Sequence, residues 1–152
     1  MASTSLVYRA LDAQVVAGHA DDPALSTGTG TMSYAQLLHE SASIAGALAQ
    51  LGLEPGTPVV LDGLDEHVEV VAVLALARVG AVPSTEGAVR LTGRPPVLSV
   101  SDQDPVAWNV LLHAGRTDPA PAPQTDPVDY AEKLTSTYER VFSTLLDGGT
   151  VS

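Results

Sequence analysis

The segment that most constrains the fold runs from residue 58 to residue 83, where a long apolar run lies between two short ones. Residues 58–61 are too apolar to face water on either side, which is typical of a buried strand with helices on both faces of its sheet. Residues 66–79 place apolar side chains nearly all round a helix, and Gly80 suits its left-handed end. Residues 81–83 begin another strand. A strand, a helix and a strand of these lengths predict a βαβ unit with parallel strands.

A second helix is predicted directly before this unit, over residues 34–51. Ser33 is a good N-cap, and Gly52 suits the residue that follows a helix end. Residues 53–56 form a turn into the first strand. The apolar positions keep to one stripe of the helix: Tyr34, Leu37, Leu38, Ile44, Ala45, Leu48 and Leu51. Each helix end and turn predicted in residues 32–83 therefore has a residue type that favours it.

The N-terminal part predicts a surface helix over residues 4–19, from apolar side chains at helical spacing. Short strands are predicted at residues 24–26 and 31–32. The glycine-rich segment 27–31 between them fits a hairpin turn or a phosphate-binding loop. We favour the hairpin, because a phosphate-binding loop usually needs a nearby basic residue and the chain's only lysine is Lys133.

Beyond residue 83 the pattern is less regular. Two more buried strands are predicted, at residues 96–100 and 106–112. Residues 118–127 form a proline-rich connector, and a C-terminal helix is predicted over 127–147, with Pro127 in its first turn. We expect residues 1–152 to form a single α/β domain.

The composition excludes several classes of protein. The net charge of −11, with seven Lys and Arg in total, argues against nucleic acids and anionic membranes as partners. The chain has no cysteine, which excludes disulfides and thiolate chemistry. The first 20 residues lack the apolar run of a signal peptide, and no stretch is apolar enough to span a membrane. These observations predict a cytoplasmic protein.

The ordered set of motifs in residues 32–83 resembles the opening of the adenylate-forming superfamily, which includes acyl-CoA synthetases and nonribosomal peptide synthetase adenylation domains. The matching segments are Ser33-Tyr34-Ala35-Gln36-Leu37, Ala45 to Gly52, Pro55-Gly56, Val59-Val60-Leu61 and Ala72 to Pro83. The resemblance implies a truncated relative of the N-terminal subdomain. It also implies a three-layer α/β fold with a mainly parallel sheet flanked by helices.

Several family features have no counterpart in this chain. It lacks the Ser/Thr/Gly-rich phosphate loop with its lysine, the Tyr-x-Thr-Glu motif, the ribose-binding aspartate and the catalytic lysine of the small C-terminal domain. It also has Thr57 where the family usually has Asp, and Asp62-Gly63-Leu64-Asp65 where the family usually has an Asn. We therefore expect no nucleotide cofactor, and no ATP-dependent ligase activity from this chain alone.

Three residues are candidates for chemistry. Asp62 follows a buried strand, at the sheet edge where open α/β sheets bind ligands. His67 lies in the densest ionisable cluster, and His113 precedes Gly115 and Arg116 in an arrangement suited to an anion. We favour an ordinary capping loop as the explanation of Asp62, and His39-Glu40 fits a solvated helix face. The four histidines lack the spacing of a metal site, so we expect no metal.

Three roles remain open at this point. The first is a non-adenylating interaction, scaffold or accessory protein of acyl or natural-product metabolism. This role is expected to involve a homodimer or a partner protein, because a truncated sheet leaves edges that must be covered. The alternatives are a small enzyme that uses acid/base chemistry, or a module that binds a small organic molecule.

Overall fold

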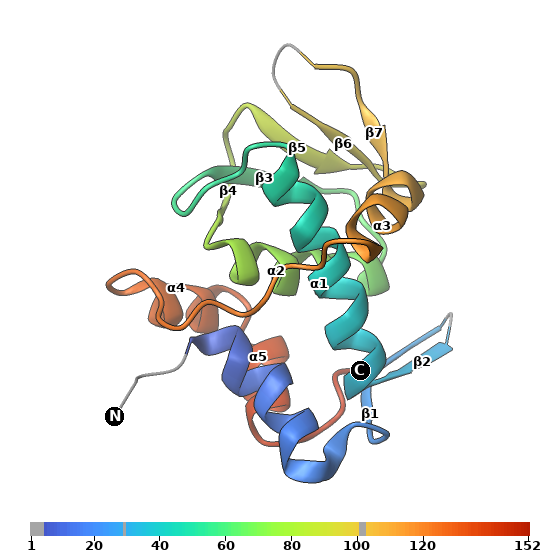
Figure 1. Cartoon of the computed structure of the whole chain (residues 1–152), viewed down its shortest axis with the longest axis vertical. Coiled ribbons are helices and arrows are strands. Elements are labelled where there is room, and N and C mark those ends of the chain that lie inside the picture. Colours follow the sequence, from blue (N-terminus) through green and yellow to red (C-terminus); the bar gives the residue numbers. More distant parts are fainter. Residues whose placement is uncertain (1–4, 29, 101–102) are drawn as a thin grey trace.

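A computed structural model describes residues 5–28, 30–100 and 103–152. The larger sheet has the strand order β4-β3-β5-β6-β7, and three layers are visible in Figure 1. Its strands are β3 (Pro58–Asp62), β4 (Val82–Ser84), β5 (Val89–Thr92), β6 (Val97–Ser99) and β7 (Val106–Ala107). Strands β4, β3 and β5 are mutually parallel, whereas β6 and β7 add on in antiparallel fashion. The α/β class and the βαβ unit are confirmed.

Helices α1 (Tyr34–Gln50), α2 (Glu66–Val79) and α3 (Trp108–Arg116) form the middle layer, below the sheet in Figure 1. Side chains of all three surround, with those of β3, β5 and β6, a void of only about 10 Å³, so this interface is closely packed. The opposite face of the sheet carries the exposed side chains of Asp62 and Arg90. The three layers are therefore sheet, helix and helix, and the expectation of helices on both faces of the sheet is wrong. Val60, on that opposite face, is only 5% exposed because it lies between Ser84 and Arg90 on the neighbouring strands.

The ends of α1 and α2 follow the sequence signals. The Ser33 hydroxyl accepts from Gln36 N at 3.1 Å, and Ser33 N donates to Gln36 Oε1 at 2.9 Å, which is a capping box. Gly80 ends α2 at φ 84°, as predicted. Asp65, a residue type that suits an N-cap, directly precedes α2, but its carboxylate pairs with Arg94 at 3.2 Å and does not cap the helix.

The third layer is formed by the two ends of the chain. It contains the π-helical segments η1 (Tyr8–Asp12) and η2 (Val15–His19), and helices α4 (Tyr130–Thr137) and α5 (Glu139–Leu146). The buried Arg78 of α2 joins the middle layer to η1, through two bonds to the carboxylate of Asp12 at 2.8 and 3.2 Å. The C-terminus reaches the N-terminal hairpin, where Val151 N donates to Ala24 O at 2.8 Å.

The glycine-rich segment forms a hairpin, as favoured from the sequence. Strands β1 (Pro23–Thr27) and β2 (Gly30–Ser33) pair in antiparallel fashion, with Thr27 opposite Gly30. Thr29 at its tip lies outside the described residues, as do residues 1–4 of the predicted first helix and residues 101–102.

Two predicted elements differ in the structure. The strand expected at residues 106–112 is mostly helix, because only Val106 and Ala107 pair with β6 before α3 begins. In α3, Trp108, Leu111 and Gly115 are buried on one face, and this spacing is helical. The helix expected over 127–147 is two helices, since Tyr138 adopts a non-helical backbone (φ −124°, ψ 49°) between them. Within the described ranges, no helix has the length and apolar character needed to cross a membrane.

Candidate functional site

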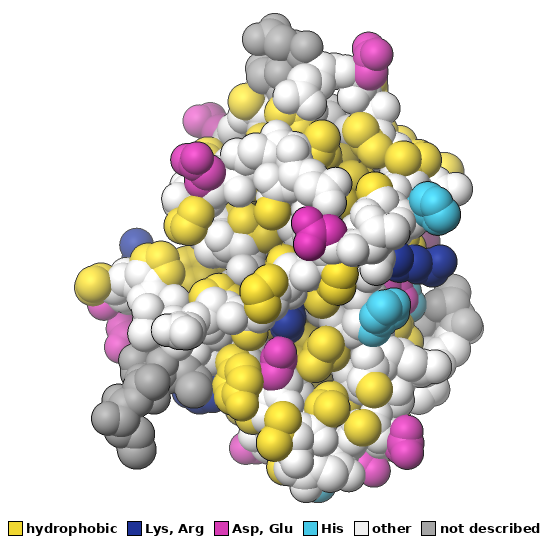
Figure 2. All heavy atoms as spheres, in the orientation of Figure 1, with side chains coloured by type: hydrophobic (Ala, Val, Ile, Leu, Met, Phe, Trp, Pro, Cys, Tyr) yellow, Lys and Arg dark blue, Asp and Glu magenta, His cyan; other side chains and the backbone are white. Residues whose placement is uncertain are grey.

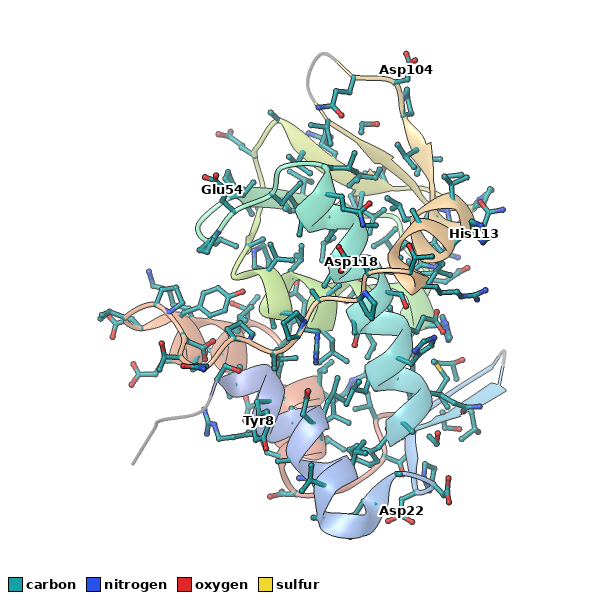
Figure 3. All side chains as sticks on the ribbon, in the orientation of Figure 1. Tyr8, Asp22, Glu54, Asp104, His113 and Asp118 are labelled. Atoms are coloured by element: carbon teal, nitrogen blue, oxygen red, sulfur yellow. The ribbon has the colours of Figure 1, made fainter. Side chains whose placement is uncertain are left out.

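The structure separates the three residues singled out from the sequence. Asp62 is exposed at the end of β3, and His113 is exposed on α3, where its side chain points outward (Figure 3). His67, in the first turn of α2, is half-buried and borders a cavity. Neither Asp62 nor His113 lines that cavity, so the three do not form one site.

The partner of His67 is Glu40 of α1. The Nε2 atom of His67 lies 3.1 Å from Oε1 of Glu40, and the two side chains are 29% and 23% exposed. An ionised carboxylate only accepts hydrogen bonds, so Nε2 carries the proton in this pair. The other ring nitrogen, Nδ1, then holds a lone pair in the neutral ring. The pair was missed from the sequence because its members are 27 positions apart on different helices.

This pair lies in a cavity of about 320 Å³, here called the histidine cavity. It is enclosed by β2, α1, the start of α2 and the end of α3, and its polar lining includes His39, Glu40, His67 and Arg116. Met32 and Leu112 provide apolar wall. Histidine and basic side chains gather over the end of α3 and the neighbouring part of α1 at the right of Figure 2.

A close helix contact places α3 against α1 at this cavity. A Cβ atom added to Gly115 would overlap the carbonyl oxygen of Ser43, so only glycine allows this approach. The next residue, Arg116, is the last of α3 and is exposed. Among the described residues, its guanidinium has no ion-pair partner.

A second cavity, of about 530 Å³, lies between α4 and the edge strand β4 and is here called the α4 groove. Its walls include Val82 and Pro83 on one side and Val128 and Lys133 on the other. Tyr130 lies at its base, where its hydroxyl is 2.5 Å from Ala81 O and 3.2 Å from Leu76 O. Burial, and then the charge of Asp126, raise the pKa of Tyr130, so the hydroxyl remains a donor.

Metal ligation finds no support in the described ranges, where no three His, Asp or Glu side chains gather as a metal site requires. Every buried side-chain nitrogen and oxygen there has a hydrogen-bond partner.

Comparisons with known proteins place the chain in a family. Residues 12–88, half of the chain, match the sequence profile of the AMP-binding enzymes, and the chain belongs to this family. The resemblance found in residues 32–83 is thereby confirmed. Nonribosomal peptide synthetase 8 of Aspergillus fumigatus is 42% identical over 60 residues, which cover 40% of this chain and 1% of that protein.

Solved structures that are similar to the chain include CoA ligases. A benzoate CoA ligase from Burkholderia xenovorans is 26% identical with a TM-score of 0.48, over 53% of this chain and 17% of the ligase. MatB from Rhodopseudomonas palustris is 27% identical with a TM-score of 0.48, over 55% of this chain and 16% of MatB. The chain thus spans less than a fifth of either structure.

Proposed function

We propose that this chain is a non-adenylating interaction and accessory protein of acyl or natural-product metabolism, acting in the cytoplasm as a homodimer. Membership of the AMP-binding family supports the metabolic setting. The proposal that the chain does not adenylate by itself rests on its sequence, which has no counterpart of the family's phosphate loop or catalytic lysine. The observation that carries the interaction role is the α4 groove.

The groove combines exposed apolar side chains with an open shape. Val128 is 91% exposed and Val82 is 37% exposed, and they are two of the four exposed large hydrophobic residues in the described part of the chain. Proline rings add to both walls. Figure 2 shows a notch at the left of the molecule with apolar side chains on both sides. Grouped apolar side chains around a hollow are typical of a surface that another molecule covers.

The charges at the groove favour a second copy of this chain as the occupant. Glu132 and Lys133 are adjacent in α4 and both line the groove. Neither side chain has an ion-pair partner among the described residues. In a two-fold dimer the same patch meets itself, so two α4 helices running in opposite directions would place each Glu132 opposite the other copy's Lys133. A patch that carries both charges side by side is complementary to itself.

Charge exchange tests this arrangement. We expect Lys133→Glu or Glu132→Lys alone to weaken the dimer, because like charges then face each other, and the double exchange to restore it. Sedimentation velocity over a range of protein concentrations measures the dimerisation constant. If the parent protein is monomeric at about 100 μM, or if the double exchange fails to restore association, self-association through this groove is wrong.

An apolar variant provides a second test with a matched control. Val128→Lys places a charge in the groove, whereas Val16→Lys places the same charge at another exposed valine, in η2 and outside the groove (78% exposed, against 91% for Val128). We expect only Val128→Lys to weaken the dimer. Equal effects of the two substitutions would show that net charge, rather than the groove, controls association.

The non-adenylating part of the proposal has its own assay. Exchange of labelled pyrophosphate into ATP, measured with benzoate as the acyl substrate, should stay at the level of the buffer for the chain alone. Exchange above that level would contradict a purely accessory role.

A further inference from the structure

The histidine cavity has a surplus of groups that suit an anion. Among the described residues, three arginine side chains are in ion pairs with carboxylates: Arg78, Arg94 and Arg140. Within the described ranges the Arg116 guanidinium has no such partner, although the chain carries a net charge of −11. An unpaired guanidinium beside a cavity in an acidic protein is a site that a smaller anion can occupy.

The carboxylate in the cavity is already engaged. Glu40 accepts a hydrogen bond from His67 Nε2, and it lies on α1, whereas Arg116 ends α3. Ser43 uses its hydroxyl to donate to His39 O at 2.8 Å. The lone pair of His67 Nδ1 accepts hydrogen bonds and does not bind an anion. The lining groups left to meet an anion include the guanidinium of Arg116 and the ring of His39. The first of these carries a permanent positive charge.

We propose that the histidine cavity binds a small organic oxyanion, with Arg116 holding its charged group and the walls at Met32 and Leu112 contacting an apolar body. A guanidinium donates two parallel hydrogen bonds to a carboxylate or a phosphate, which fixes the orientation of the ligand. The cavity of about 320 Å³ is at the lower end of ordinary ligand sites, so the body is compact. This site is separate from the α4 groove and does not depend on dimer formation.

Glu40 sets a second, independent expectation. Among the described residues, Glu40 is the one carboxylate that lines the cavity, and it repels a bound anion because like charges oppose each other at short range. Replacing it with glutamine removes that repulsion and keeps the shape of the side chain. Glu40→Gln should therefore bind an anion more tightly than the parent protein, whereas Arg116→Gln should bind it more weakly.

The test uses three probes of similar size and shape: benzoate, phenyl phosphate and the neutral benzamide. Isothermal titration calorimetry gives their dissociation constants for the parent, Arg116→Gln and Glu40→Gln. Arg90→Gln is the matched control, because Arg90 is also an exposed arginine without an ion-pair partner in the described ranges, and it lies on the outer face of the sheet. Comparison of benzoate with phenyl phosphate identifies which oxyanion the cavity prefers.

We expect one or both anions to bind, benzamide to bind at least tenfold more weakly, and Arg116→Gln to lose about tenfold or more in affinity for the anion. Arg90→Gln should match the parent, and Glu40→Gln should gain severalfold. No binding of either anion at 10 mM probe, equal binding of benzamide, or equal losses in the two arginine variants would each overturn the proposal. A weaker affinity in Glu40→Gln would overturn the placement of the anion beside Glu40. Val128→Lys, which alters only the α4 groove, should leave the affinity unchanged, so that failure of the dimer and failure of this site are distinguishable.

Discussion

The ion pair between Arg78 and Asp12 allows a quantitative test of how the helical layers are joined. The Arg78 side chain is 2% exposed, and its Nε also donates to Ala120 O at 3.0 Å. Asp12→Ala would leave the guanidinium buried, with that carbonyl as its remaining acceptor among the described residues. The charge of Arg78 is then compensated only by whatever water reaches the space left by Asp12.

The magnitude follows from the burial of the two partners. Removing one member of a fully buried pair costs about 3–5 kcal/mol. The Asp12 side chain is 21% exposed, so water partly replaces it, and we expect a loss of about 2–4 kcal/mol in the free energy of unfolding. At about 0.05–0.15 kcal/mol per residue, 152 residues give a total of roughly 8–23 kcal/mol, so the variant still folds.

Urea unfolding followed by the fluorescence of Trp108, the only tryptophan, measures the loss. Asp65→Ala is the matched control, because Asp65 and Arg94 form an exposed pair, at 53% and 65%, which should contribute less than about 1 kcal/mol. A difference below about 1 kcal/mol between the two variants would refute the argument that burial makes the Arg78 pair strong. Asp12→Asn should lie between Asp12→Ala and the parent, since the amide oxygen still accepts one hydrogen bond.

Further predictions concern packing, alkaline pH and a buried hydroxyl. Gly115→Ala should lower the free energy of unfolding by about 3 kcal/mol, because the added carbon overlaps Ser43 O, whereas Gly28→Ala, with open space around it, should be close to neutral in thermal unfolding. A comparable loss in the two variants would contradict the close contact of α1 and α3. Burial, with the charge of Asp22, raises the pKa of Tyr34 to about 12, so the folded state keeps this proton above the normal value of 10. The contribution of this pKa shift to the free energy of unfolding is fully present below pH 10. It falls between pH 10 and 12 by up to about 1.4 kcal/mol per pH unit. Tyr34→Phe should flatten that fall in urea unfolding at pH 9 and pH 11, and an unchanged slope would exclude Tyr34 as its source. Tyr130→Phe should destabilise by about 1–3 kcal/mol in the same assay, because Ala81 O and Leu76 O lose their buried donor, and no change would mean that water replaces it.

The βαβ unit could be predicted because its signals are local. Ser33, Gly52 and Gly80 mark helix ends through their own backbone and side-chain chemistry, and each does so in the structure. The run at 58–61 identified β3, but it did not determine what covers each face. Burial of Val60 comes from the side chains beside it in the sheet, which the sequence of one strand does not reveal.

The elements that were mispredicted depend on longer-range contacts. The apolar run 106–112 is short enough to fit a strand or a helix, and its identity is decided by the packing of α3 on α1. The break at Tyr138 has no glycine or proline to announce it. Glu40 and His67 meet only because α1 and α2 pack together, so a scan of neighbouring residues finds neither their pair nor the cavity around it.

The contact between Gly115 and Ser43 gives a single position that reports on the histidine cavity. Because the backbone of α1 contacts the Cα of Gly115 directly, the spacing of α1 and α3 does not depend on any side-chain rotamer. Binding of a ligand therefore costs little conformational entropy at this part of the cavity wall. A larger residue at the equivalent position of another protein would force the two helices apart and move the arginine that follows. A residue larger than glycine at that position is therefore incompatible with a cavity of this shape.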